Sequence, residues 1–114
     1  MSLTNSAIYG MISLMNVSTT AEFDQWYLDQ EARIRTLIDA RITKIKEHNH
    51  LGKWRYLGSG LAELKWENGT RVYFAKIAVL EILLIWGGFK NAQKKDIKKA
   101  KNILQRYAYT SIKT

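Results

Sequence analysis

The chain has 114 residues, no cysteine and no proline, and it carries a formal net charge of +8. This length fits one domain with its own core, and the absence of cysteine excludes a disulfide framework and a thiolate metal site. The charge is uneven, because residues 53–114 hold thirteen Lys or Arg against four Asp or Glu, whereas residues 1–52 hold five against six. A basic half within a folded domain is typical of proteins that bind a polyanion.

We expect neither a secretion signal nor a membrane segment. The longest apolar run, residues 77–88, is about a dozen residues long and contains Glu81, whereas a membrane helix needs about 20 residues. Residues 1–10 lack a basic start and a long apolar stretch, so they do not have the pattern of a signal peptide. We therefore predict one cytoplasmic domain over residues 1–114, with residues 1–10 as a candidate extension.

The first half predicts a short strand and two helices. Residues 8–15 have a composition compatible with a strand, and Thr19-Thr20-Ala21-Glu22 has the pattern of a capping box at a helix start. Phe23, Trp26 and Tyr27 then recur at helical spacing. A second helix follows and ends near residues 47–50, with one apolar face and one basic face. Its expected inward residues are Ile34, Leu37, Ile38, Ile42 and Ile45, and its expected outward residues are Arg33, Arg35, Arg41, Lys44 and Lys46.

The second half predicts four strands and a last helix. Residues 53–57 and 61–67 are short and aromatic-rich, and Asn68-Gly69 is the strongest hairpin signal in the chain. Residues 70–76 are the returning strand, and residues 79–86 are apolar enough for a central strand that Gly87-Gly88 ends. A helix over about residues 91–107 follows, with Ile97, Ala100, Leu104 and Tyr107 inward. The predicted class is α+β, with an N-terminal α-hairpin on a four- to five-stranded, mainly antiparallel sheet and a C-terminal helix.

Several short motifs occur in a recognisable order over roughly residues 22–107. They are Phe23-x-x-Trp26, Ala40-Arg41-Ile42, Gly52-Lys53-Trp54-Arg55-x-x-Gly58-x-Gly60-x-x-Glu63-Leu64-Lys65, Arg71-Val72-Tyr73-Phe74 and Gly87-Gly88-Phe89-Lys90-x-x-Gln93-x-x-Asp96-Ile97-x-x-Ala100-Lys101. Their order and spacing resemble the RelE/ParE superfamily of toxin–antitoxin toxins, and within it the phage-derived, HigB-like addiction module killer proteins. Two departures are Lys65, where that family often has Arg, and a shorter turn before Arg71.

The resemblance implies a RelE-like fold and the toxin of a type II toxin–antitoxin module. It implies a metal-independent endoribonuclease, an mRNA interferase without a cofactor, that enters the ribosome, cleaves mRNA and inhibits translation. The implied partners are a cognate antitoxin, the ribosome and mRNA, with no membrane, and a homodimer stays open. Two alternatives also stay open: a ParE-like toxin that inhibits a partner such as DNA gyrase without cutting RNA, and an inactive relative that retains only binding.

RNA cleavage by transesterification requires deprotonation of the 2′-hydroxyl, stabilisation of the phosphate and protonation of the leaving 5′-oxygen. Arginine binds phosphate oxygens bidentately, whereas lysine acts as a point charge, or as an acid or base if its pKa is lowered. The resemblance places the phosphate-binding arginine at Arg71. The alternative for Arg71 is a solvated strand arginine paired with Glu63 or Glu67.

Lys65 is the second candidate catalytic residue, and its role depends on the hairpin turn. A two-residue Asn-Gly turn would pair Trp66 with Arg71 and set Lys65 on the opposite face of the sheet. A three-residue loop with a bulge at Gly69 would instead put Lys65 and Arg71 on one face. A catalytic role for Lys65 requires the second geometry, and both geometries fit the sequence.

Further candidates surround this pair. Lys90 follows the Gly-Gly pair and is predicted to supply a third cation. Tyr73 shares a face with Arg71, where it either stacks on a base, donates its phenol proton or belongs to the core. His48 and His50 are interpreted as exposed residues, and we predict no metal site. Lys53 and Arg55 are predicted to contact the RNA backbone, and Lys94, Lys95, Lys98 and Lys99 form either an electrostatic docking face or an ordinary solvated helix side.

Overall fold

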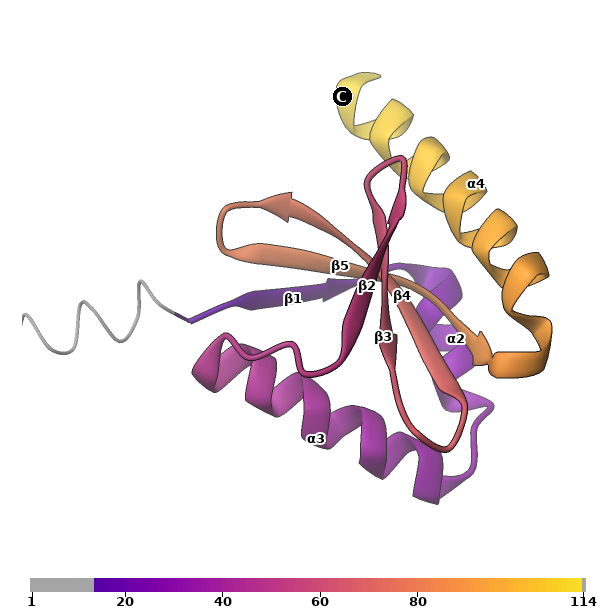
Figure 1. The fold of residues 1–114 in the computed structure, drawn as a ribbon. Coiled ribbons are helices and arrows are strands. Elements are labelled where there is room, and N and C mark those ends of the chain that lie inside the picture. The colour runs from indigo at the N-terminus through magenta and orange to yellow at the C-terminus, as the bar shows by residue number, and fades with distance from the viewer. Residues whose placement is uncertain (1–13, 114) are drawn as a thin grey trace, which may run out of the picture.

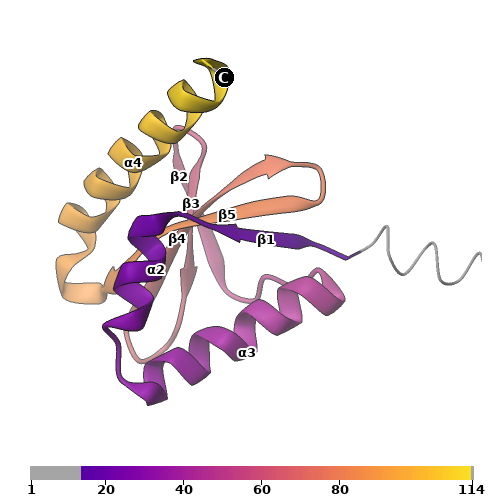
Figure 2. The same cartoon turned by 180° about the vertical axis from the view of Figure 1, so that it is seen from behind.

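The computed structural model describes the backbone of residues 14–113 and the side chains of residues 14–108. Within these residues the chain forms one five-stranded sheet with helices on both faces (Figures 1 and 2). The elements in chain order are β1 (Asn16–Thr19), α2 (Ala21–Leu28), α3 (Ala32–His48), β2 (Trp54–Gly58), β3 (Leu61–Lys65), β4 (Thr70–Ala78), β5 (Glu81–Phe89), the 3-10 turn η1 (Lys90–Ala92) and α4 (Gln93–Lys113).

The sheet confirms the predicted α+β class. Its strand order is β1-β5-β4-β3-β2, and β2, β3, β4 and β5 form successive antiparallel pairs. Strand β1 runs parallel to β5 at the other edge, so the sheet is mixed but mainly antiparallel. The strand predicted at residues 8–15 falls largely outside the described residues, and the observed first strand begins at Asn16.

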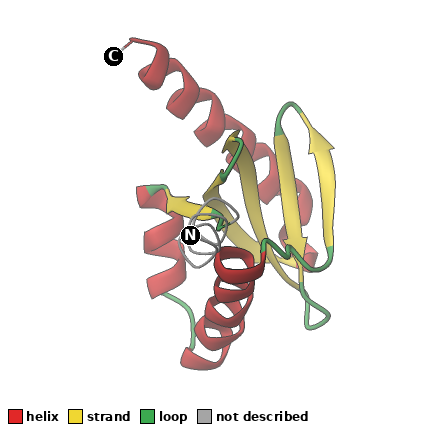
Figure 3. Cartoon of the chain, turned by 90° about the vertical axis from the view of Figure 1, so that its left-hand side faces the viewer, coloured by secondary structure: helices red, strands yellow, loops and turns green. Residues whose placement is uncertain are grey.

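Each face of the sheet buries its own apolar layer, because side chains alternate along every strand. Helices α2 and α3 cover one face, and Figure 3 shows them as neighbours at one side of the strands. Helix α4 covers the opposite face through Ala100 and Ile103, which pack against residues of β3, β4 and β5. The face under α4 is the one that carries the candidate site.

Helix α2 begins with half of the predicted capping box. The Thr20 hydroxyl accepts a hydrogen bond from the Phe23 N–H at 2.9 Å and donates one to the Ile85 carbonyl at 2.7 Å. Glu22 stands one position too early to return the bond to the cap, and its carboxylate instead forms an ion pair with Arg106 at 3.1 Å. The cap residue therefore fastens α2 to β5 as well as starting the helix.

Arg41 on α3 corrects the prediction that this side chain turns outward. Its guanidinium donates to the carbonyls of Leu51, Lys53 and Lys65, at 3.1, 3.3 and 2.8 Å. It also lies 4.2 Å from the centre of the Trp66 ring. Burial lowers the pKa of Arg41, and the side chain joins α3 to the start of β2 and the end of β3.

The Gly87-Gly88 pair does not end β5, contrary to the prediction. Both residues are paired within the sheet, Gly87 with Val72 and Gly88 with Arg71, and the strand continues to Phe89. A Cβ atom on Gly87 would lie 2.3 Å from the Trp26 ring, and one on Gly88 would lie 2.0 Å from the Asp96 carboxylate. The glycines are thus required by the close approach of α2 and α4 to the two faces of the strand.

Candidate nucleic-acid interface

The β3–β4 hairpin brings Lys65 and Arg71 directly opposite each other. Its loop has three residues, since the Trp66 N–H donates to the Thr70 carbonyl and the Gly69 N–H donates to the Trp66 carbonyl, both at 3.1 Å. Gly69 has φ +100°, as the bulge position requires. Of the two turn geometries considered, the structure has the one that places Lys65 and Arg71 on the same face of the sheet.

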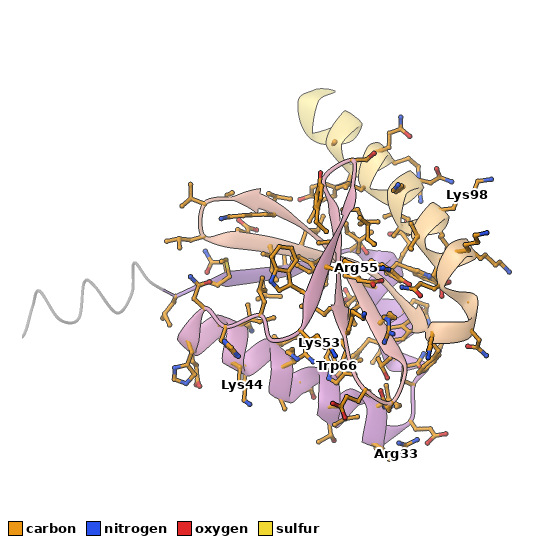
Figure 4. All side chains as sticks on the ribbon, in the orientation of Figure 1. Arg33, Lys44, Lys53, Arg55, Trp66 and Lys98 are labelled. Atoms are coloured by element: carbon orange, nitrogen blue, oxygen red, sulfur yellow. The ribbon has the colours of Figure 1, made fainter. Side chains whose placement is uncertain are left out.

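Lys53 extends this pair across a third strand. The Lys65 N–H donates to the Lys53 carbonyl at 2.9 Å, so Lys53 lies opposite Lys65, immediately before the first residue of β2. Lys53, Lys65 and Arg71 therefore form a row at one end of the sheet, which we call the basic row. The Lys53 carbonyl and the ring of Trp66, the residue that follows Lys65, both contact the Arg41 guanidinium (Lys53 and Trp66 are labelled in Figure 4).

Lys90 lies beside the same hairpin. Its backbone N–H donates to the Gly69 carbonyl at 2.8 Å, and its exposed side chain borders an open hollow with Glu67, Asn68 and Phe89. The fold thus brings Lys90 to the end of the sheet that holds the basic row, although 19 positions separate Lys90 from Arg71 along the chain.

Arg71 is only 7% exposed. Its guanidinium donates to the carbonyls of Trp66 and Thr70, at 3.1 and 2.9 Å, while its Nε has no hydrogen-bond partner among the described residues. No ion pair joins it to Glu63 or Glu67 in this part of the chain. Arg71 is therefore held against the hairpin turn and is not the solvated, carboxylate-paired arginine of the alternative interpretation.

A second row of side chains runs across the sheet next to the basic row. The strand registers align Arg55, Glu63, Tyr73 and Trp86, one from each of β2 to β5. Glu63 is fully buried, and its carboxylate accepts from Arg55 at 2.9 Å and from Gln93 at 2.9 and 3.0 Å. Arg55, predicted to contact RNA, is half-exposed and tied to this carboxylate.

Tyr73 is fully buried in this row, and its hydroxyl has no hydrogen-bond partner among the described residues. Burial raises the pKa of Tyr73 above its ordinary value, and the negative charges of Asp96 and Glu63 raise that pKa further. Beside it, the Trp86 indole N–H donates to the Asp96 carboxylate at 3.1 Å. The phenol is thus kept protonated and covered in this conformation.

The predicted docking lysines lie along α4. Lys94, Lys95 and Lys98 are exposed, and Figure 4 shows Lys98 pointing away from the strands. Lys99 is different, because its ammonium lies 3.9 Å from the centre of the Trp86 ring. The exposed lysines extend the positive charge of the sheet end onto the helix that covers it.

Sequence reasoning missed three members of the site: Glu63, Gln93 and Asp96. Alternation along β3 could have identified Glu63, since it stands two residues before Lys65 and so shares its face. The spacing of Gln93 and Asp96 by three on a helix also puts them on one face. No sequence pattern, however, shows which strand residues they contact.

His48 and His50 lie exposed where α3 ends, as predicted. Among the described residues, no group of His, Cys, Asp or Glu has the arrangement needed to hold a metal ion. None of the helices in the same part of the chain has the length and apolar character needed to cross a membrane.

The opposite face of the sheet carries an apolar hollow of about 420 Å³. Trp54 and Tyr56 line it from β2 and are 49% and 62% exposed, and Val79 lines it from the β4–β5 turn. Phe74 and Ile82 form part of its floor. Exposed aromatic side chains around a hollow are typical of surfaces that bind another molecule.

Comparison with known proteins identifies a relative of this chain. No protein-family model matches the chain, and no solved structure matches it. An uncharacterized protein of Haemophilus influenzae is 33% identical over 94 residues, which make up 80% of this chain and 94% of that protein. The similarity therefore covers almost the whole of the relative and most of the domain described above.

Proposed function

We propose that this chain, which belongs to the same family as the uncharacterized Haemophilus influenzae protein, is the toxin of a type II toxin–antitoxin module. Its proposed action is ribosome-dependent cleavage of mRNA in the cytoplasm, which stops translation. The observation that carries the proposal is the basic row of Lys53, Lys65 and Arg71 across three strands, with Lys90 beside the same hairpin.

The chemistry assigned to these residues is charge stabilisation. The 2′-hydroxyl gives its proton to water and its oxygen attacks the adjacent phosphorus. The bond to the 5′-oxygen then breaks, and negative charge builds on the phosphate oxygens. Arg71 and Lys65 stand on neighbouring strands, whose backbone bonds hold them in place, and fixed cations are the groups that stabilise such charge. In this proposal Lys90 approaches the same phosphate from the hairpin turn, and Tyr73 supplies the proton that the leaving 5′-oxygen takes up.

The lysines of α4 fit a second task, which is docking. Exposed cations attract the RNA backbone without regard to sequence, and a ribosome presents a continuous surface of phosphates. The exposed side chains of Lys94, Lys95 and Lys98 lie beside the sheet face that carries the basic row. A cognate antitoxin is the proposed partner that holds this activity in check.

The test is induction of the chain in growing cells, followed by primer extension on translated mRNAs. We expect cuts within translated codons, and we expect Arg71→Ala to abolish them. The matched control is Arg33→Ala, which removes the same charge from an exposed site on α3 and should leave the cuts unchanged. Intact mRNA in arrested cells that contain folded protein would contradict the nuclease proposal.

A ParE-like toxin that blocks a protein partner is the second candidate. Two observations favour it: Arg71 and Tyr73 are buried, and the apolar hollow beside Trp54 and Tyr56 offers a surface for a protein. Such a toxin would arrest growth with intact mRNA and, if its partner is DNA gyrase, with accumulated DNA breaks. Substitution of Trp54 by Ala should then relieve the arrest, whereas Arg71→Ala should not.

A further inference from the structure

The first turn of α4 lies directly across Tyr73. In the row that crosses the sheet, Tyr73 stands between Glu63 on β3 and Trp86 on β5. Gln93 binds Glu63 and Asp96 binds Trp86. Because Gln93 and Asp96 are three residues apart on one helix face, the two bonds fasten the turn on both sides of Tyr73.

The Asp96 carboxylate also fills a place beside Arg71. Gly88 is the direct strand partner of Arg71, and the Asp96 Oδ2 atom lies 2.0 Å from the position where a Cβ of residue 88 would stand. The indole N–H of Trp86 holds the other oxygen, Oδ1, at 3.1 Å. The Asp96 carboxylate therefore lies against the backbone of Gly88, the strand partner of the buried Arg71, and accepts a hydrogen bond from Trp86.

Two buried donors near this carboxylate remain unused. The Arg71 Nε and the Tyr73 hydroxyl have no partner among the described residues, and both side chains are more than nine-tenths buried. The two residues are separated by one position on β4, so they project from the same face of the strand. A buried donor without an acceptor is unfavourable, and a ligand with several acceptor oxygens would relieve both.

We propose that Trp86, Gly88 and Arg71 form a phosphate subsite, which Asp96 fills in the free protein and an RNA phosphate fills when the first turn of α4 moves away. The phosphate then takes the place of the carboxylate over Gly88 and accepts hydrogen bonds from Trp86, Arg71 and Tyr73. Asp96 is thus an internal inhibitor of the site. The choice of RNA as ligand rests on the proposed function.

The helix can make this movement without leaving the sheet. Its fully buried apolar contacts come from Ala100 and Ile103, one to two turns beyond Asp96, while Ile97, directly after Asp96, packs against the same layer and is only partly buried. Only polar contacts to Glu63 and Trp86 are identified for Gln93 and Asp96, the two residues that fasten its first turn. Polar contacts of this kind exchange readily for contacts with a ligand, whereas the apolar layer resists separation.

The test compares Asp96→Asn with the wild type. The amide keeps the size of the carboxylate and an acceptor for Trp86 but removes the negative charge. The probe is a short 2′-O-methyl RNA oligonucleotide, which has no attacking 2′-hydroxyl, titrated at several salt concentrations. We expect the dissociation constant to fall at least about threefold, equivalent to roughly 0.7 kcal/mol. We also expect the indole N–H resonance of Trp86 to shift when the oligonucleotide binds to the wild type.

The matched control is Asp24→Asn, because Asp24 is an exposed carboxylate on α2, which covers the other face of the sheet. It changes the net charge equally and should leave the dissociation constant close to that of the wild type. Gln93→Ala is a second variant, which loosens the turn without altering the subsite and should also tighten binding. Circular dichroism melting curves of each variant establish that it is folded.

The proposal is overturned if Asp96→Asn binds the oligonucleotide no more tightly than Asp24→Asn, or if the Trp86 resonance stays in place while RNA binds. Inorganic phosphate, titrated in parallel, should shift that resonance only at higher phosphate concentrations, and tighter binding of inorganic phosphate than of RNA would overturn the assignment of the ligand. If mRNA is cleaved in cells and the two Asn variants bind the oligonucleotide equally, the phosphate-subsite proposal is wrong and the nuclease proposal stands. If mRNA stays intact and Asp96→Asn binds the oligonucleotide more tightly, the nuclease proposal is wrong and the phosphate-subsite proposal stands.

Discussion

Arg41 connects three separate parts of the backbone through a single guanidinium. Its amino groups reach the carbonyls of Leu51, Lys53 and Lys65, and its plane covers Trp66. These contacts hold the loop after α3 against the β3 end from which Lys65 projects. Arg41 therefore supports the backbone of Lys53 and Lys65, two members of the basic row.

We predict that Arg41→Ala lowers the free energy of unfolding by about 2–3 kcal/mol, because three carbonyls, two of them partly buried, lose a charged donor and Trp66 loses its cation. Urea denaturation followed by tryptophan fluorescence measures the change. Arg33→Ala, an exposed position on the same helix, should stay within about 0.5 kcal/mol of the wild type. Equal effects of the two substitutions would show that the contacts of Arg41 contribute little.

Tyr73 makes a second residue-scale prediction, which concerns alkaline stability. Burial raises its pKa in the folded state above the ordinary value of 10.0. Above pH 10 the unfolded chain therefore loses the phenol proton while the folded chain keeps it, and the folded state loses stability as pH rises. The loss from this group approaches about 1.4 kcal/mol per pH unit until the folded pKa is reached.

Tyr73→Phe removes this contribution, so its stability should exceed that of the wild type increasingly above pH 10. Urea midpoints of both proteins, measured from pH 8 upward, test this difference directly. All other ionisable groups are the same in the two proteins, so their contributions cancel in the comparison. A difference in stability that stays constant with pH would mean that Tyr73 is open to solvent.

Helix α2 and strand β5 are joined by the Thr20 side chain and by close packing at Gly87, which has no side chain. The Thr20 hydroxyl links the start of α2 to Ile85 of β5, and Trp26 rests on Gly87 of the same strand. At the level of elements, β5 is the strand on which both faces converge, since α4 lies on Gly88 from the other side. The Gly-Gly pair marks close packing here, not the end of a strand.

We expect Thr20→Ala to destabilise the protein by about 1–2 kcal/mol, because the Phe23 N–H and the Ile85 carbonyl both lose their partner. Thr36 is the matched control: it is exposed within α3, and its hydroxyl only bonds back to the Ala32 carbonyl. Thr36→Ala should be neutral or slightly stabilising, since alanine is the better helix former. Thermal melting followed by circular dichroism separates the two outcomes.

The charge of the whole molecule is distributed over elements that the fold brings together. The basic row comes from the end of the sheet, Lys90 from η1, and the exposed lysines from α4. Two negative groups on this side are internal, since Glu63 is buried and Asp96 is held by Trp86, whereas Glu67 is exposed in the hairpin loop. The surface that an RNA would meet is consequently more positive than the composition of its elements suggests.

Binding to single-stranded RNA should depend on salt through these lysines. Each of Lys94→Ala, Lys95→Ala and Lys98→Ala should weaken binding and reduce the slope of log K against log salt by about 0.7, the value for one phosphate contact on a single strand. Lys44→Ala, an exposed lysine of α3, should leave the slope unchanged. Equal losses at Lys44 and Lys98 would show that RNA has no preferred side.

Local patterns were enough to predict the order of helices and strands and the concentration of charge after residue 53. Period-2 and period-3.6 spacing, Asn68-Gly69 and the Thr20 region all act over a few residues, so the α+β class followed from the sequence alone. The same patterns placed Arg71 and Lys65 on neighbouring strands but left two turn geometries. The hairpin loop chose between them, because its length sets the register of every pair that follows.

Burial and long-range contacts depended on the assembled fold. Arg41 faces inward because carbonyl acceptors from residues 51, 53 and 65 converge on it. Gly87 and Gly88 lie within a strand and are glycines because side chains of two helices pack against them. Glu63 and Trp86 are bound by Gln93 and Asp96, which belong to a helix that begins beyond the last strand. Each contact joins segments whose separation in sequence carries no local signal, so packing of the helices on the sheet alone determines it.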